Sequence, residues 1–107
     1  MAVRALVRLP PTVRRGEVFE VRAMLAHPME TGYRRDSDGR MLARDIVRRL
    51  EVRLAGEPVF AADLHPAIAA NPFVAFTLVA QAGGPLVLRW TGDRGFDHTE
   101  TVMLVVE

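Results

Sequence analysis

Histidine is the residue type in this sequence best suited to metal binding or proton transfer. The chain has three, His27, His65 and His98, on separate segments and without a ligand spacing such as His-x-His. His98 and Glu100 fall on one face of an expected strand, so a histidine–carboxylate pair can form there. Isolated histidines without such spacing are weak evidence for a site, and we expect all three to be structural. The two that precede a proline are expected to bond to local backbone groups.

Nucleophilic catalysis is poorly supported as well. The chain has no cysteine, which excludes a disulfide framework, a thiolate metal site and a cysteine nucleophile within it. Ser37 is the single serine and lies in the turn sequence Asp36-Ser37-Asp38-Gly39, with no strand-to-helix elbow around it. We therefore predict no catalytic residue, no metal and no cofactor, and hence a chain that is not an enzyme.

Charge is unevenly distributed along the chain. All basic residues are arginine; net charge is +2 for residues 1–33, +3 for residues 34–53 and −4 for residues 54–107. Such a dipole suits an oriented encounter with a charged partner. The overall net charge of +1 and the absence of an aromatic-plus-basic pattern argue against nucleic acid. Apolar runs are too short to span a bilayer, and arginine interrupts the first residues, so the sequence taken alone indicates a cytoplasmic protein.

Alternating apolar and polar residues predict strands through most of the chain. The 107 residues are expected to form one domain, residues 1–107. About seven short strands and no amphipathic helix predict an all-β fold, an immunoglobulin-like antiparallel β-sandwich, with a small barrel as the alternative. The expected core residues are Phe19, Val21, Leu25, Leu50, Val52, Phe76, Leu78, Leu88 and Trp90. The last strand is apolar on both faces near 102–106, which fits either burial between layers or cover by a second chain.

The connection 27–44 is long for a link between strands, and its internal turn signal predicts a protruding ribbon. A second irregular segment, residues 63–72, has two prolines and small apolar residues, which predicts a crossover lying against the body of the domain. Interface cores are enriched in Tyr, Met and Arg. The candidate partner-binding residues are Tyr33, Arg34, Arg35, Arg40 and Met41 in the ribbon, and Leu64, Ile68 and Phe73 in and just after the crossover.

These two segments also carry a family resemblance. The runs His27-Pro28-Met29-Glu30-Thr31-Gly32-Tyr33-Arg34-Arg35-Asp36 and Ala62-Asp63-Leu64-His65-Pro66-Ala67-Ile68-Ala69-Ala70-Asn71-Pro72-Phe73-Val74-Ala75-Phe76 resemble the SoxZ family of sulfur-oxidation proteins. The likeness extends over essentially the whole chain, including Arg14-Arg15-Gly16-Glu17 and Leu88-Arg89-Trp90. Two long motifs in the right order make it specific.

The resemblance implies a non-catalytic subunit with an immunoglobulin-like fold. SoxZ pairs with SoxY as the carrier of the bacterial thiosulfate-oxidation system, and the sulfur intermediates ride on a cysteine near the C-terminus of SoxY. The implied partners are thus a SoxY-like protein and, transiently, the Sox cytochrome, thiosulfohydrolase and sulfur dehydrogenase, with neither nucleic acid nor membrane. The family acts in the periplasm, so the resemblance implies co-export with a signal-bearing partner. The alternative function is a free-standing sandwich with a histidine–carboxylate metal site acting in redox chemistry or hydrolysis.

Overall fold

The computed structural model describes residues 4–65, 68 and 70–107. Within these residues the chain forms seven strands, one 3-10 turn and no α-helix. The strands are β1 (Ala5–Arg8), β2 (Val18–Leu25), β3 (Val47–Leu54), β4 (Glu57–Asp63), β5 (Phe73–Val79), β6 (Gly84–Gly92) and β7 (Asp97–Leu104), and the 3-10 turn is Asp93–Gly95. The prediction of an all-β fold is confirmed.

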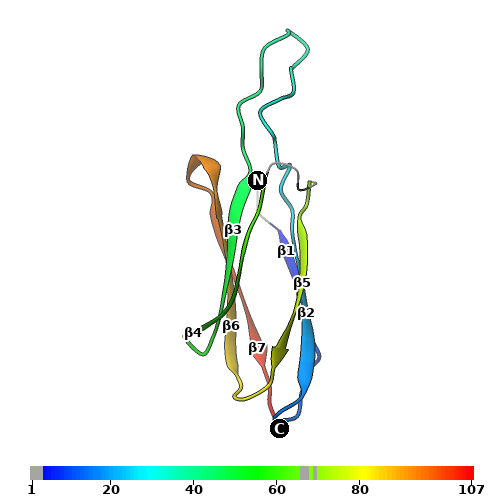
Figure 1. The fold of residues 1–107 in the computed structure, drawn as a ribbon, viewed down its shortest axis with the longest axis vertical. Helices are drawn as coiled ribbons and strands as arrows, with labels where there is room; N and C mark the ends of the chain where they lie inside the picture. Colours follow the sequence, from blue (N-terminus) through cyan, green and yellow to red (C-terminus); the bar gives the residue numbers. More distant parts are fainter. Residues whose placement is uncertain (1–3, 66–67, 69) are drawn as a thin grey trace.

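Two antiparallel sheets face each other as a sandwich (Figure 1). One sheet has the strand order β1-β2-β5, and the other has the order β4-β3-β6-β7. The molecule is elongated, measuring 57 × 20 × 20 Å, because the ribbon between β2 and β3 extends beyond the end of both sheets. The expected sandwich with a protruding ribbon is therefore confirmed, and the barrel alternative is not what the chain forms.

The core is made by the inward-facing residues of each strand. In β2, Phe19, Val21, Ala23 and Leu25 are buried, while the residues between them face outward. This alternation is what a period of two produces when one face of a sheet is covered. All the predicted core residues are buried in the structure except Leu78, which is partly buried and packs against the core.

The two long edges of the sandwich differ. On one side β1 lies close to β7, and a parallel bridge joins Val13 to Val106, so this side is closed. On the other side β4 and β5 face each other, and the rings of Phe60 and Phe76 stack with centroids 4.2 Å apart. Met103 on the last strand and Val105 just after its end are exposed, so within this chain the strand is not buried between layers. No helix among the described residues is long and apolar enough to cross a membrane.

Candidate protein-binding surface

The ribbon is a twisted hairpin held by few backbone bonds. A bridge between Glu30 and Asp45 closes its base, with N···O distances of 2.9 and 2.8 Å, and a second bridge joins Arg35 to Met41 nearer the tip. At the tip the Asp36 side chain accepts bonds from the N–H groups of Asp38 and Arg40, at 2.9 and 3.0 Å. The turn that the sequence predicts at Asp36-Ser37-Asp38-Gly39 is therefore present, with an Asp side chain organising it.

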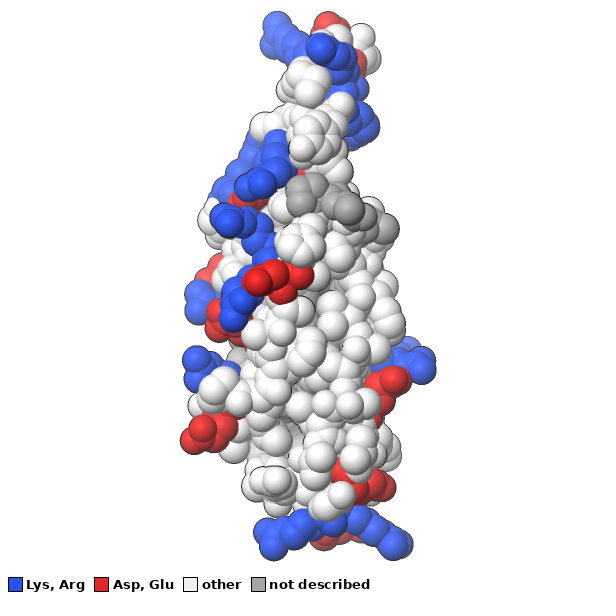
Figure 2. Space-filling view, viewed as in Figure 1, with Lys and Arg blue, Asp and Glu red and all other residues white. Residues whose placement is uncertain are grey.

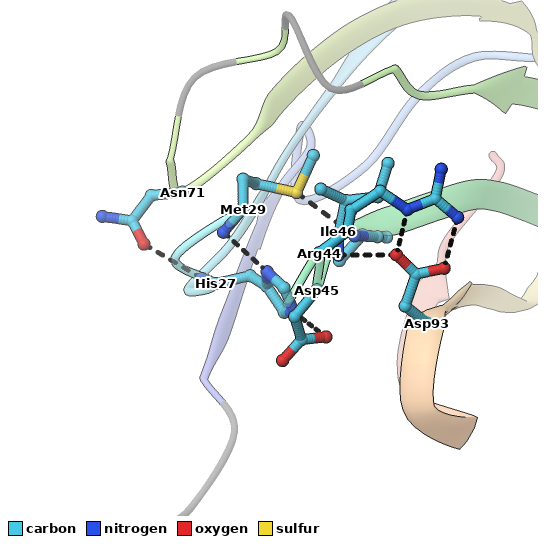
Figure 3. A network of polar contacts seen from close by, with 8 residues as sticks. His27, Met29, Arg44, Asp45, Ile46, Asn71 and Asp93 are labelled. Atoms are coloured by element: carbon cyan, nitrogen blue, oxygen red, sulfur yellow. Dashed lines mark hydrogen bonds and ion pairs between the residues drawn. The ribbon is translucent and has the colours of Figure 1, made fainter. Parts of the chain in front are cut away.

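The root of the ribbon is anchored by His27, which is 6 % exposed (Figure 3). The Nδ1 atom of His27 accepts a 2.9 Å bond from the Met29 N–H, so this imidazole does bond to local backbone as expected. The His27 N–H donates to Asn71 Oδ1 at 3.0 Å, and the Asn71 N–H donates to the His27 carbonyl at 2.7 Å. His27 thus ties the start of the ribbon to the end of the crossover.

Asp93 anchors the returning strand of the ribbon (Figure 3). Its carboxylate accepts two bonds from the Arg44 guanidinium, at 2.8 and 2.9 Å, and a third from the Ile46 N–H at 3.2 Å. The preceding Gly92 leaves no room for a side chain, because an added Cβ would overlap the Ile46 carbonyl and lie 2.8 Å from Val47 Cα. The close backbone approach allows the turn carrying Asp93 to reach the ribbon.

Electrostatics at this root keep His27 neutral and Asp93 charged. Burial lowers the pKa of His27, and the carboxylates of Asp45 and Asp93 oppose this shift without cancelling it. Burial by itself would raise the pKa of Asp93, but the Arg44 guanidinium and the Ile46 N–H together hold it below its ordinary value. His27 Nε2 lies 3.9 Å from Asp45 Oδ1, beyond hydrogen-bond distance. The root is therefore a structural network with a neutral imidazole.

The ribbon presents an aromatic and a flexible apolar side chain to solvent. Tyr33 is 81 % exposed and Met41 is 50 % exposed. Arg34 is paired with Glu30 at 2.6 Å, which lowers the pKa of Glu30, and Arg35 donates to the Gly39 carbonyl at 2.8 Å. Arg40 is also exposed. Figure 2 shows basic and acidic side chains together at the tip of the ribbon. Because Arg34 is already paired, Arg35 and Arg40 contribute more of the positive charge there.

The candidate residues around the crossover are less alike than the sequence suggested. Leu64 is only 7 % exposed and belongs to the core, and Ile68 is partly buried against it. Phe73 is 58 % exposed at the start of β5. Residues 66–67 and 69 lie outside the described residues, so the crossover is known in part. Leu64 therefore has little surface to offer a partner, whereas Phe73 has much.

His98 and Glu100 meet on β7, with His98 Nε2 2.8 Å from Glu100 Oε1, as the sequence pattern allows. His65 is exposed and His27 is committed to the ribbon root. Across residues 4–65, 68 and 70–107, no three His, Cys, Asp or Glu side chains come together as a metal site would require. The pair on β7 is thus an isolated hydrogen bond. The His98 ring lies beside Trp90, with the two ring centroids 6.2 Å apart and the ring planes tilted by 33°.

A bulge that sequence reasoning missed brings two arginines to one face. Val47 pairs with Gly92 and Arg49 with Thr91, so Arg48 is an extra residue in β3. Arg48 and Arg49 border an open hollow of about 480 Å³ together with Asp63 and His65. The sequence feature that could have predicted the bulge is the spacing of apolar residues. Val47 and Leu50 are three positions apart and both fully buried, which breaks the period of two.

A second feature that the sequence pattern concealed is apolar surface on the smaller sheet. Its outward face carries four exposed large apolar residues: Leu6, Val18, Phe73 and Val79. An outward face of an antiparallel sheet is normally polar when it meets water. These residues lie on three different strands, so only the pairing of the strands reveals that they share a face.

Taken together, the fold and the surface define a small β-sandwich with exposed aromatic, apolar and arginine side chains and, among its described residues, no cluster of metal-ligating side chains. Residues 7–103 match the family model described as "Sulphur oxidation protein SoxZ". The chain belongs to this family, which makes it a subunit of the Sox sulfur-oxidation system. No sequence among the curated proteins matches the chain.

Solved structures with a similar fold include superoxide reductases. The superoxide reductase (neelaredoxin) from Ignicoccus hospitalis superposes with a TM-score of 0.72 at 19% identity, covering 96% of this chain and 80% of that one. A putative superoxide reductase from Thermotoga maritima gives a TM-score of 0.71 at 14% identity, covering 96% and 85% of the two chains. At this low identity the likeness extends to the fold alone.

Proposed function

We propose that this chain is the non-catalytic subunit of a heterodimeric sulfur carrier in bacterial thiosulfate oxidation. The observation that carries the proposal is the match of the SoxZ family over residues 7–103. In this assignment a SoxY-like partner bears the sulfur intermediates on a cysteine near its C-terminus. The absence of cysteine from this chain agrees with that division of labour, since the sulfur-bearing thiol then belongs to the partner.

The proposed work of this chain is to hold the partner and to meet the other Sox enzymes. The ribbon projects from one end of the sandwich and carries the exposed side chains of Tyr33 and Met41. Both residue types are enriched where proteins meet. We assign the ribbon to transient docking with the cytochrome, the thiosulfohydrolase and the sulfur dehydrogenase in turn. Periplasmic action follows in this proposal from co-export with a signal-bearing partner.

Co-purification tests the proposal directly. The chain and its SoxY-like partner are co-expressed, and the complex is weighed by native mass spectrometry before and after incubation with thiosulfate and the Sox cytochrome. We expect a one-to-one heterodimer whose added mass is on the partner's cysteine. A partner with that cysteine replaced by serine is the control and should pair without gaining mass.

The same preparation addresses the metal-site alternative. Elemental analysis of the chain purified alone should find no stoichiometric transition metal, because the His98–Glu100 pair supplies two ligands and structural or catalytic sites need three or more. A tightly held metal that is lost in a His98→Ala variant, together with failure to pair with the SoxY-like protein, would replace the carrier assignment by the alternative.

A further inference from the structure

Strand β5 is the outer strand of the smaller sheet and lacks the features that usually protect a sheet edge. Its seven residues, Phe73–Val79, contain no charge and no proline, and they pair with β2 without a register shift. Natural edge strands are normally interrupted by charges, prolines or bulges, or kept short, because a bare edge accepts further strands. By these criteria β5 is an unprotected edge strand that can pair with another strand.

The other edges in the described part of the chain are protected. Strand β4 carries Glu57, Pro58 and Asp63 and has a register shift against β3. Strand β1 has four residues and ends in Arg8, and β7 carries two acidic residues among its eight. Strands β1 and β7 also lie against each other at the closed side of the sandwich. The contrast makes β5 exceptional within this one fold.

The backbone phase of β5 follows from the bonds at its two ends. The Leu25 N–H donates to the Pro72 carbonyl at 3.1 Å, and the Ala80 N–H donates to the Glu17 carbonyl at 2.8 Å. Because hydrogen-bonded pairs alternate in an antiparallel ladder, the even-numbered residues of β5 bond to β2. The N–H and C=O groups of the four odd-numbered residues, Phe73, Ala75, Thr77 and Val79, therefore point away from the sheet.

Apolar surface lies on both sides of this row of backbone groups. On the sandwich side, an open groove of about 400 Å³ between β4 and β5 is lined mainly by apolar residues, among them Leu54, Val59, Leu78 and Val79, with Glu57 and Gln81 as its polar members. On the outer face, Phe73 and Val79 are more than half exposed. Figure 2 shows this side of the molecule as a broad uncharged area with the charged side chains at its margins. A partner strand with alternating apolar residues would bury them on both faces.

Charge at one point of the outer face limits what the occupant can be. Arg8 on β1 lies directly opposite Arg22 on β2. On the other side of Arg22, the residue opposite it on β5 is the small Ala75. Like charges that face each other across strands repel. Glu20, two residues before Arg22 on β2 and opposite Thr77, accepts a 2.5 Å bond from Arg22 and offsets one of the two positive charges. One positive charge of the Arg8–Arg22 pair remains, and a carboxylate opposite Ala75 on an added strand would offset it.

We propose that β5 binds an extended strand of the SoxY-like partner, which continues the sheet β1-β2-β5 into the partner. The strand is apolar and uncharged apart from an Asp or Glu at the position that faces Ala75. A second copy of this chain fits less well, because its β5 has no carboxylate to offset the remaining charge of the Arg8–Arg22 pair. This inference rests on the proposed carrier function and adds to it the place and the manner of pairing.

Amide hydrogen exchange resolved by residue reads the proposed bonds directly. In the chain alone, the amides of Val74, Phe76 and Leu78 should be protected and those of Ala75 and Thr77 should exchange rapidly. Adding the SoxY-like partner should slow exchange at Ala75 and Thr77 by about tenfold or more, because each N–H becomes a ladder donor. A complex in which both amides still exchange at the free rate would overturn the inference.

A pair of proline variants tests the same edge by mutation. In Thr77→Pro the proline removes an outward N–H and leaves the bonds to β2 intact, so the fold should persist. The Kd for the partner should rise by about tenfold or more. The matched control is Ala61→Pro on the edge strand β4. The Leu64 N–H donates to the Arg48 carbonyl at 2.8 Å, so the even-numbered residues at this end of β4 bond to β3 and the Ala61 N–H points away from the sheet. Circular dichroism verifies that both variants are folded.

The outcomes separate this inference from the function on which it rests. If no heterodimer forms with the unaltered chain, the carrier assignment fails. If the heterodimer forms and Ala61→Pro weakens it while Thr77→Pro does not, the partner uses the β4 edge and the inference alone is wrong. Slow exchange at Ala75 and Thr77 in the concentrated chain without partner would identify a second copy as the occupant and would equally contradict it.

Discussion

His27 shows how a histidine beside a proline can be structural in this fold. Its ring is buried, its Nδ1 accepts the Met29 N–H, and its edge packs against Phe96 with the two ring centroids 4.9 Å apart. The neutral ring satisfies this arrangement, since an imidazolium has no lone pair with which to accept the Met29 bond. The sequence could predict a local backbone bond for His27, but Phe96 lies far along the chain and its contact could not be foreseen.

The lowered pKa of His27 makes the stability of the chain depend on pH. As pH falls through the ordinary histidine pKa of about 6.5, the unfolded chain takes up a proton that the folded chain does not. The free energy of unfolding should therefore be highest, as far as His27 is concerned, above about pH 6.5 and should decrease as pH falls below that value. Urea unfolding of the parent and of His27→Asn, which keeps an acceptor near the Nδ1 position, measures the effect.

The two chains should differ in slope. The decrease in unfolding free energy between about pH 7.5 and pH 5.5 should be smaller in His27→Asn than in the parent, because asparagine does not titrate. Equal slopes in the two chains would show that His27 does not contribute. Carboxylate titration, which begins at lower pH, affects both chains alike.

Gly92 is required by packing and not by backbone conformation. Its backbone is extended, but an added Cβ would meet the carbonyl of Ile46. Gly92→Ala should therefore lower the free energy of unfolding by about 1–3 kcal/mol, as overpacking does. Gly39→Ala in the ribbon turn is the comparison, because a Cβ there meets nothing and costs only the strain of a φ of +79°. Denaturant titration that finds Gly92→Ala neutral would mean that the backbone moves apart without cost.

At the scale of elements, the ribbon is anchored at its root and free at its tip. Buried residues hold the root, Met29 on one arm and Ile46 on the other, while the tip is kept in shape by the Asp36 turn. The turn was readable from the sequence because its signal is local. The Arg44–Asp93 pair was not, because it joins residues 49 positions apart in the sequence.

The ribbon arginines should act on encounter with the other Sox enzymes and not on heterodimer affinity. Replacing Arg34 and Arg35 by alanine should leave the heterodimer intact and slow its reaction with the next enzyme by about tenfold at low salt. Raising the salt concentration should shrink the difference, because exposed charges are screened. The reaction rate is measured by following the sulfur adduct on the partner.

Arg14 and Arg15 provide a matched control for this pair. They are adjacent and exposed, and they lie near the C-terminus of the chain, at the end of the sandwich away from the ribbon. Their double alanine variant changes net charge by the same amount at the wrong end of the molecule. Equal slowing by both double variants would mean that overall charge, and not the ribbon, guides the encounter.

At the scale of the whole molecule, the sandwich is closed on one long side and open on the other. The Val13–Val106 bridge closes one side, whereas the Phe60–Phe76 stack stands between two strands that do not pair with each other. An open side with apolar surface favours a partner that binds only the folded chain. Such a partner stabilises the fold by mass action, without changing any contact inside it.

We therefore expect the folded chain to become more stable as its partner is added. At a free partner concentration of about 100 times Kd, the unfolding free energy should rise by about 2.7 kcal/mol. Because Trp90 is the single tryptophan and is buried, fluorine-labelled tryptophan in this chain alone reports its unfolding by NMR in the mixture. A partner that lacks the strand it adds to β5 should give a smaller rise, and an unfolding midpoint independent of partner concentration would contradict stabilisation by binding.

The sequence by itself determined the class of fold, the ribbon, its turn and the greater part of the core. Each of these depends on local information: a period of two marks the strands, and Asp, Ser and Gly mark the turn. The two long motifs in order also indicated the family, which the match over residues 7–103 establishes.

Only the tertiary structure decided which strands lie at an edge, and so which surface is open. The residues of β5 alternate like those of any strand, and nothing local says that its outer neighbour is missing. The same limit explains Leu64, expected at the surface and found in the core, and Arg48, placed by a bulge against β6. Burial and pairing depend on which segments distant in sequence meet, because a strand's environment is set by its neighbours and not by its own pattern.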